Sequence, residues 1–297
     1  MLTIFSTLKP FKGHIGIIQR NAITSWALLH PRPEIILFGN EEGTAEAAMD
    51  IGVLHVSQVA RNEFGTPLLN DLFQKAEQLA SHQTLCYVNA DILLLDDFLE
   101  AVIRVREWRS QYLMVGRRWD VDICDPINFV APGWQSSLRQ LALRTNRQRS
   151  PEWIDYFAFN KGLGAGLLPF AIGRTRWDNW LVWHACSIGR LVVDLSESVM
   201  AVHQNHDYQH HPKGYKGVWA GEEARRNDEL GGGWWRHYTT QDATHCVRAD
   251  GIRLNFRRWS VRIQRAASHF LQPVWFLLLD LTRPVRNRLG LRRGSVG

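Results

Sequence analysis

The sequence has few cysteines, and none of them stands near another. The four are Cys86, Cys124, Cys186 and Cys246, and they form no C-x-x-C pair. This spacing excludes a zinc ribbon and a thioredoxin-like motif, and it argues against a secreted scaffold held by disulfides. A chain of 297 residues, 45% of them hydrophobic, can bury a core without such bonds. We therefore expect a protein of the reducing cytoplasm.

Two common nucleotide-binding signatures are also missing. No G-x-G-x-x-G follows the first strand-like segment, and no G-x-x-x-x-G-K-[ST] occurs anywhere. The glycine-rich segment 162–166 lies late in the chain and follows an aromatic segment, so we expect a loop there and no dinucleotide site. A conventional dehydrogenase or P-loop enzyme is disfavoured.

Long hydrophobic segments are absent as well. The first residues hold neither a basic segment nor a small-residue cleavage site, so we expect no signal peptide. The longest apolar segment, residues 274–281, is too short to cross a bilayer and contains Asp280. We expect a cytoplasmic protein, either soluble or peripheral at the inner face of a membrane.

Positive charge is concentrated at the carboxyl end. Residues 248–297 hold eleven arginines, no lysine and two aspartates, a net charge of +9, and the preceding residues carry −3. Apolar residues at helical spacing predict an amphipathic helix over residues 257–270. We expect a catalytic domain over residues 1–247 and a basic helical tail over residues 248–297. The tail suits an anionic membrane surface, or it docks on the domain with its arginines in water; nucleic acid is not the expected partner.

The first ninety residues alternate between strand-like and helix-like patterns. Strands are predicted over residues 2–7, 34–38, 53–56 and 85–88, and helices over residues 14–29, 44–51 and 68–80. This alternation predicts an α/β fold with a mostly parallel, Rossmann-like sheet and flanking helices. Ligands bind such sheets at the carboxyl ends of the strands, here residues 7–9, 39–41 and 89–91.

A pair of polar residues follows the fourth predicted strand. Asn89 and Asp91 stand two apart, so in an extended chain their side chains point to the same side. Hard oxygen ligands of this kind suit Mg²⁺ or Mn²⁺ bridging phosphates. The alternative is a turn in which both side chains cap the following helix.

Two later segments carry further chemistry. Asp178 stands at a predicted helix start between aromatic residues, where it is either a base facing a sugar hydroxyl or a helix cap. His203 ends a strand-like segment and can reach a metal or a diphosphate. His206, His210 and His211 follow it, as a second site or as a polar loop.

The order of these motifs resembles that of the GT-A-fold nucleotide-sugar glycosyltransferases of the family-2 type. That family carries Asp-x-Asp after the fourth strand, an acidic motif at a helix start and a late metal-binding histidine. Asn89-Ala90-Asp91, Asp178 and His203 are similar to these, in that order, and the resemblance runs from Leu2 to about His211. The chain departs from the family pattern at Asn89, where aspartate is common.

The resemblance implies transfer of a sugar from a UDP- or GDP-sugar donor to a glycan or lipid-linked acceptor, assisted by Mn²⁺ or Mg²⁺, in polysaccharide assembly. It implies Asp178 as catalytic residue and Asp91 with His203 as metal ligands, His206 being the alternative to His203. The implied donor-binding residues are Thr7, Lys9, Arg61, Asn62, Asn89 and Asp91, and the implied sugar and acceptor pocket is formed by Asp155, Tyr156 and Trp177.

Two other functions stay open at this point. A nucleotidyltransferase that makes nucleotide sugars shares the fold, but it usually has a glycine-rich loop after the first strand, and Ser6 to Gly13 hold one glycine. A non-catalytic protein that binds carbohydrate or nucleic acid is compatible with thirteen tryptophans and a basic tail.

Overall fold

The computed structural model describes residues 1–207 and 214–267 of the chain. The chain divides into two compact units, Met1–Asn255 and Phe256–Gly297. The first unit contains every strand of the described residues and the cleft discussed below.

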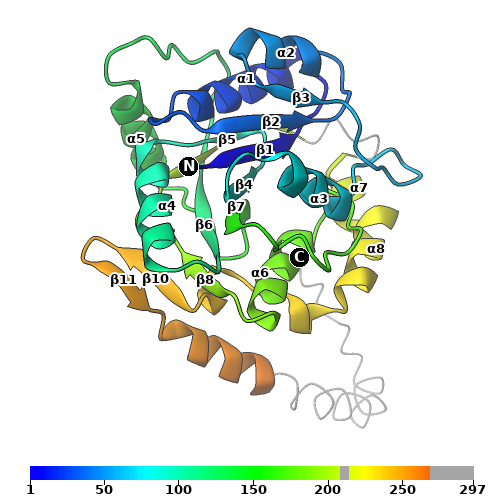
Figure 1. Ribbon diagram of the computed structural model, residues 1–297, viewed down its shortest axis with the longest axis vertical. Helices are drawn as coiled ribbons and strands as arrows, with labels where there is room; N and C mark the ends of the chain where they lie inside the picture. The colour runs from blue at the N-terminus through cyan, green and yellow to red at the C-terminus, as the bar shows by residue number, and fades with distance from the viewer. Residues whose placement is uncertain (208–213, 268–297) are drawn as a thin grey trace, which may run out of the picture. The chain divides into compact units, whose positions relative to one another are not determined.

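A single sheet of eleven strands runs through the first unit (Figure 1). The strands are β1 (Thr3–Thr7), β2 (Glu34–Phe38), β3 (Leu54–Val56), β4 (Thr84–Val88), β5 (Ile92–Leu93), β6 (Tyr112–Val121), β7 (Ile154–Asn160), β8 (Leu191–Asp194), β9 (Ala201–Gln204), β10 (His245–Arg248) and β11 (Gly251–Leu254). The helices that cover the sheet or border it are α1 (Gly13–Ala27), α2 (Thr44–Ile51), α3 (Leu69–Leu79), α4 (Asp96–Trp108), α5 (Trp134–Thr145), α6 (Trp177–Ser187), α7 (Gly214–Ala220) and α8 (Glu222–Gly231).

The strand order is β11-β10-β8-β6-β7-β4-β1-β2-β3, and β9 pairs with both β5 and β6. Six of the ten strand pairings are parallel. The predicted α/β class with a mostly parallel sheet is therefore confirmed. The first four strands and three helices follow the chain in the predicted alternation, and Gly52 ends α2 in the left-handed conformation (φ 71°) that glycine adopts without steric cost.

In the second half of the sheet, the strand-like patterns of residues 191–193 and 198–202 indicate β8 and β9, whereas β6, β7, β10 and β11 were not predicted. Strand β7 lies antiparallel between β4 and β6, so a strand of opposite direction interrupts the parallel order. Strands β5 and β9 form a short antiparallel ladder in which Ile92 pairs with His203. Strands β10 and β11 form a hairpin that continues the sheet to Leu254, and the division into units falls after Asn255 instead of at residue 247.

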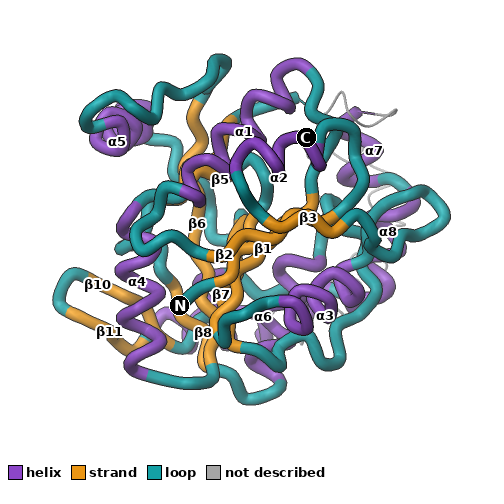
Figure 2. The backbone as a smooth tube through the Cα atoms, turned by 45° about the horizontal axis from the view of Figure 1, so that its top comes forward, coloured by secondary structure: helices purple, strands orange, loops and turns teal. Residues whose placement is uncertain are grey.

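Each face of the sheet packs against its own set of helices (Figure 2). Because alternate residues of a strand point to opposite faces, Ile4 packs with Trp26 and Phe98 under α1 and α4, whereas Phe5 packs with Phe73 under α3. Each of these side chains is fully buried. Removing a ring of this kind from a packed core costs about 3–5 kcal/mol, so the two layers fix the strand ends on which the cleft depends.

The second unit is described as far as residue 267. Residues 257–267 are helical, as predicted, and Phe256, Trp259 and Ile263 are exposed. Phe270, the apolar segment 274–281 and the arginines that follow it lie outside the described residues. Within residues 1–207 and 214–267, no helix has both the length and the hydropathy needed to cross a membrane.

Candidate active site

A cleft of about 780 Å³ opens along the edge of the sheet where β1, β2, β4 and β6 end. It lies at the carboxyl ends that the strand pattern predicted. Its lining carries both signs of charge, with the cations Lys9, Arg61, Arg118, Arg174 and Arg176 and the carboxylates Glu41, Asp91, Glu152, Asp155, Asp178 and Asp228.

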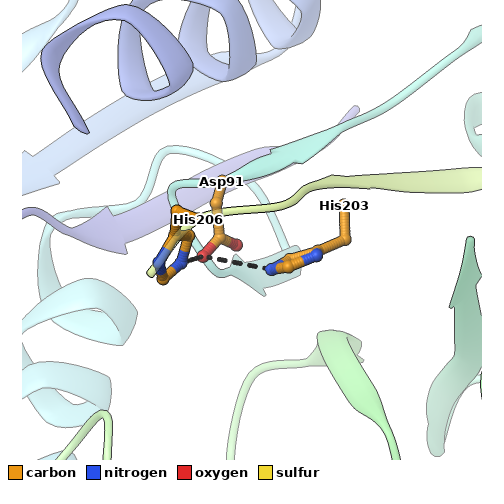
Figure 3. Close-up of side chains that lie close together, drawn as sticks. All are labelled: Asp91, His203 and His206. Atoms are coloured by element: carbon orange, nitrogen blue, oxygen red, sulfur yellow. Dashed lines mark hydrogen bonds and ion pairs between the residues drawn. The ribbon is translucent and has the colours of Figure 1, made fainter. Parts of the chain in front are cut away.

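Three side chains that lie far apart in the sequence meet at one point of this cleft (Figure 3). Asp91 follows β4, His203 lies on β9, and His206 lies in the loop after β9. The Asp91 carboxylate stands between the two imidazole rings. Its Oδ2 lies 3.1 Å from Nε2 of His206 and 3.7 Å from Nε2 of His203.

These three side chains fit a divalent cation. Their ligand atoms all lie within 4.8 Å of one another, which is the spacing of groups around one ion. Oδ1 of Asp91 is buried and has no hydrogen-bond partner among the described residues. A buried carboxylate oxygen without a partner is costly unless an ion or a ligand group satisfies it. One carboxylate and two imidazoles suit Mn²⁺ better than Mg²⁺, which prefers oxygen ligands alone.

The charges around Asp91 keep it ionised and ready to bind a cation. Burial alone raises the pKa of this carboxyl, but the charge of His203 and the hydrogen bond from His206 outweigh it and hold the pKa well below its usual range. Burial lowers the pKa of the Lys9 ammonium, against the opposing effect of Asp91. Lys9 and Asp91 both line the cleft, and the ammonium and the carboxylate attract each other there.

Buried amides fix the backbone at this corner. Gln204 donates from Nε2 to the carbonyl of Asp91 (3.3 Å) and accepts from Asn21 on α1 (2.9 Å). Gln19, two residues before Asn21 on α1, holds Lys9 by both backbone groups, accepting from its N–H (2.7 Å) and donating to its carbonyl (2.8 Å). Since all three amides are buried, these bonds are strongly constrained and set the positions of Lys9 and Asp91.

Asp178 lies in the first turn of α6 and lines the cleft. The residue before the helix, Arg176, has φ 86°, which is an uncommon conformation for a residue with a side chain and is found most often at functional sites. Burial, with the nearby charge of Asp155, raises the pKa of Asp178 to about 7. A carboxyl with this pKa is well matched to proton transfer near neutral pH.

Asn89 does not join the cation cluster. Its Nδ2 donates to Oδ1 of Asp155 (2.6 Å), and its backbone N–H donates to the carbonyl of the same residue (2.9 Å). Arg118 donates to the other oxygen of Asp155 (2.9 Å) and lies over the ring of Trp153. Asn89 and Asp155 are therefore held together beside the cluster, and both line the cleft.

The loop between β3 and α3 places Arg61 in the lining of the cleft. Arg61 forms an ion pair with Glu41 (2.7 Å), which follows β2. Asn62, in contrast, caps its own loop: its Oδ1 accepts from the N–H groups of Phe64 and Thr66, and its Nδ2 donates to Glu223 on α8. The structure thus places Arg61 at the cleft and Asn62 behind it.

Comparisons with known proteins gave matches among solved structures alone: no protein-family model and no curated protein sequence matches the chain. The S. aureus TarS 1–349 structure with UDP-GlcNAc matches with 12% identity and a TM-score of 0.47, over 69% of this chain and 58% of that one. The Pyrobaculum calidifontis mannosyltransferase with GDP-Man and Mn²⁺ matches with 13% identity and a TM-score of 0.43, over 68% of this chain and 56% of that one. The Mycobacterium tuberculosis glucosyl-3-phosphoglycerate synthase with Mn²⁺, UDP and phosphoglyceric acid matches with 14% identity and a TM-score of 0.41, over 69% of this chain and 71% of that one. The matched region thus spans less than two thirds of the first two chains.

Most residues that the sequence singled out lie together at the cleft, namely Thr7, Lys9, Arg61, Asn89, Asp91, Asp155, Trp177, Asp178, His203 and His206. Tyr156 does not. It follows Asp155 on β7 and so points to the other face of the sheet, where it packs edge-on against Phe98 at 5.6 Å. Its hydroxyl lies where a Cβ of Gly116 would stand, which explains the glycine inside β6. His210 and His211 lie outside the described residues.

Sequence reasoning missed two groups of residues, of which Arg118 and Arg174 line the cleft, whereas Asp120 contacts the lining residues Arg118 and His203. Arg118 and Asp120 lie on β6, a strand that was not predicted. Charged residues two apart at the end of a hydrophobic segment share one side of a strand, so the sequence could indicate that these two side chains lie together, but not that they lie beside His203. Arg174, which pairs with the buried Glu223 of α8 (2.6 Å), had no local signal, since its partner is 49 residues away.

Proposed function

We propose that the protein transfers a sugar from a nucleotide-diphosphate donor to a hydroxyl acceptor with the help of a divalent cation. The observation that carries the proposal is the meeting of Asp91, His203 and His206 at the edge of a parallel sheet, in a cleft that also holds the raised-pKa carboxyl of Asp178. A cation site and a base in one cleft meet the two needs of this reaction, a stabilised leaving group and a deprotonated nucleophile.

Asp91, His203 and His206 would hold Mn²⁺ or Mg²⁺. When bound, the ion offsets negative charge on the departing nucleoside diphosphate, which is Lewis-acid assistance. Lys9 lies in the same part of the cleft and adds a positive charge for the diphosphate. A buried ammonium beside a phosphate is stabilised in its charged form, so donor binding would reverse the pKa depression of Lys9.

Asp178 would act as the base. The acceptor oxygen forms a bond to the anomeric carbon, the bond from that carbon to the diphosphate oxygen breaks, and the acceptor proton passes to the Asp178 carboxylate. This assignment implies inversion at the anomeric carbon. Its support is the pKa of about 7, because near neutral pH a large share of this carboxyl is ionised and the carboxylate is basic enough to receive a proton.

The other cleft residues divide between donor and acceptor. We assign Thr7, Arg61 and Asn89 to the donor, because they lie at the ends of the strand units around Asp91. Asp155 and Trp177 lie toward Asp178 and suit the sugar and the acceptor, since aromatic faces pack on the C–H groups of sugar rings and carboxylates accept hydrogen bonds from their hydroxyls. A UDP- or GDP-sugar donor and a glycan or lipid-linked acceptor, in polysaccharide assembly, complete the proposal.

The second unit suits an anionic membrane surface. Phe256, Trp259 and Ile263 are exposed in the described residues, and residues 256–297 hold nine arginines and one aspartate, a net charge of +8. Exposed apolar residues beside arginines are the composition of segments that lie in the lipid interface. The enzyme would then work in the cytoplasm at the inner face of a membrane, where a lipid-linked acceptor is found.

The proposal is tested by the thermal stability of the full chain with UDP, GDP, CMP or dTDP, each with and without Mn²⁺. A ligand at a hundred times its dissociation constant adds about 2.7 kcal/mol to the free energy of unfolding. For a protein of this size that is a rise in Tm of about 4 °C. One nucleotide is expected to raise the Tm, and to do so far more with Mn²⁺.

Asp91→Asn should lose the Mn²⁺-dependent part of that rise. Asp50→Asn is the matched control, because Asp50 forms an exposed ion pair with Arg20 outside the cleft and its substitution removes the same charge. A Tm that none of the four nucleotides moves, with or without Mn²⁺, would contradict the proposal.

A further inference from the structure

A second carboxylate, Asp120, lies directly behind His203. Asp120 is on β6 and His203 on β9, and the parallel register of these strands pairs the two residues. Asp120 is buried, and its Oδ1 lies 3.3 Å from Nδ1 of His203. The nitrogen that faces Asp120 is thus the one turned away from Asp91.

The surroundings of Nδ1 decide where His203 carries its proton. The second neighbour of Nδ1 is Oδ1 of Asn205, at 3.2 Å. The orientation of that amide is set by its other end, because Nδ2 of Asn205 donates to Asp122 (2.7 Å). Nδ1 therefore faces two oxygen acceptors, and only a protonated Nδ1 can bond to them. A neutral His203 then has its lone pair on Nε2, the atom that faces Oδ2 of Asp91 at 3.7 Å.

Two acceptors that face each other at this distance call for a positive group between them. With the proton on Nδ1, the lone pair of His203 Nε2 and the Asp91 carboxylate both point into the same space. A metal ion can accept the Nε2 lone pair and bind the Asp91 carboxylate at the same time. A second proton on His203 would occupy Nε2, so that this nitrogen could no longer act as a ligand. The arrangement is therefore prepared for a metal ion.

Asp120 is itself held in place from two sides. Nε of Arg118 lies 3.0 Å from Oδ1 and Nε of Arg149 lies 2.7 Å from Oδ2. Arg118 also binds Asp155, which accepts from Asn89, so the carboxylate behind His203 is connected to the Asn89–Asp155 pair beside the cation cluster. A carboxylate fixed by two guanidinium groups has little freedom to turn away from His203.

We infer that Asp120 is a positioning residue, which holds His203 with its proton on Nδ1 and presents Nε2 to the divalent cation. The inference rests on the proposed function, because it concerns the cation site of that reaction. Partners of this kind, behind a metal-binding histidine, contribute about 10–100-fold to metal affinity.

The test is Mn²⁺ binding to the full chain without nucleotide, followed by the electron paramagnetic resonance signal of free Mn²⁺. We expect Asp120→Asn to weaken binding about 10–100-fold, and Asp50→Asn, which removes a charge far from the cleft, to leave it unchanged. His203→Ala and the double variant complete a cycle. If Asp120 acts through His203, the substitution at Asp120 has little further effect in the His203→Ala background.

The outcomes separate this inference from the proposed function. Wild-type protein that binds no Mn²⁺, alone or with nucleotide, contradicts the proposed function. Wild-type protein that binds Mn²⁺ while Asp120→Asn binds equally well overturns the inference alone. An equal loss from Asp120→Asn with and without His203 also overturns it, since a general effect of charge does not require the histidine.

A second measurement uses the wild-type protein, so it does not depend on whether a variant at Asp120 folds. The ¹⁵N shifts of the His203 ring, assigned by comparison with His203→Ala, report which nitrogen is protonated in the neutral wild-type side chain. The inference predicts a proton on Nδ1. A proton on Nε2 would overturn it, whatever the metal affinities are.

Discussion

Among single residues, Asp178 has a raised pKa that can be measured directly. Its pKa is raised from 3.8 to about 7 by burial and by the charge of Asp155. Since a base must be ionised to accept a proton, kcat/KM is expected to rise with pH through about 7 and then to level off. Asp178→Asn should lower kcat by at least about 100-fold. A rate that does not change with pH across neutrality would contradict the assignment of Asp178 as the base.

The same shift predicts how stability depends on pH. The folded protein keeps a proton on Asp178 between the ordinary pKa and about 7, while the unfolded chain has lost it. The free energy of unfolding should therefore fall as pH rises through this interval. Asp178→Asn has no proton to lose there, so its unfolding by denaturant should show a smaller decline than the wild type. An equal decline in both proteins would show that Asp178 is not the group responsible.

Local sequence could indicate residues whose chemistry depends on their immediate neighbours. Asp91 was evident because it follows a buried strand, and Asp178 because it starts a helix between aromatic residues. Tyr156 shows the limit, since the choice between the two faces of β7 depends on the register of that strand. Asp120 was not found, because its partner His203 lies 83 residues later and only the pairing of β6 with β9 joins them.

Among the elements, α8 has a role that its sequence does not reveal. Asn227 on α8 is buried and holds the segment before α6 by three bonds: it accepts from the N–H of Ala171 and donates to the carbonyls of Ala171 and Thr175. This segment leads to Asp178. Asn227→Ala leaves these backbone groups without their partner, so we expect a loss of about 1–3 kcal/mol in the free energy of unfolding.

Denaturant unfolding measures that loss, and Asn128→Ala is the control. Asn128 is exposed and accepts a hydrogen bond from Val130 of its own loop, so its substitution should change stability little. Equal stability of the wild type and Asn227→Ala would contradict the role assigned to α8.

The first half of the fold was predictable because its elements are short, regular and joined by short loops. Residues 2–88 alternate between two hydrophobic periods, and these periods identify strands and helices without tertiary information. The reversed strand β7 and the β5–β9 ladder are different, because strand direction and pairing are set by contacts between distant segments. The last residue of β10 and the whole of β11 lie in the segment that carries the basic charge and were therefore assigned to the tail.

For the whole molecule, the separation of charge predicts binding to anionic membranes. The full chain should sediment with vesicles that contain phosphatidylglycerol and not with phosphatidylcholine vesicles, and added salt should weaken the binding. Trp259→Ala should reduce it, since Trp259 is an exposed apolar residue of the second unit. Trp234→Ala, at an exposed tryptophan of the first unit, should not. Equal binding to both kinds of vesicle would contradict an electrostatic attachment.

We propose that this cleft breaks the bond between a sugar and a nucleoside diphosphate with the help of a cation. The direct measurement is release of nucleoside diphosphate from UDP- and GDP-sugars by the full chain, with Mn²⁺ and with a chelator. We expect release from one class of donor, its loss with the chelator, and its loss in Asp91→Asn and Asp178→Asn while both variants stay folded. Full release in the presence of chelator, or from both variants, would contradict it.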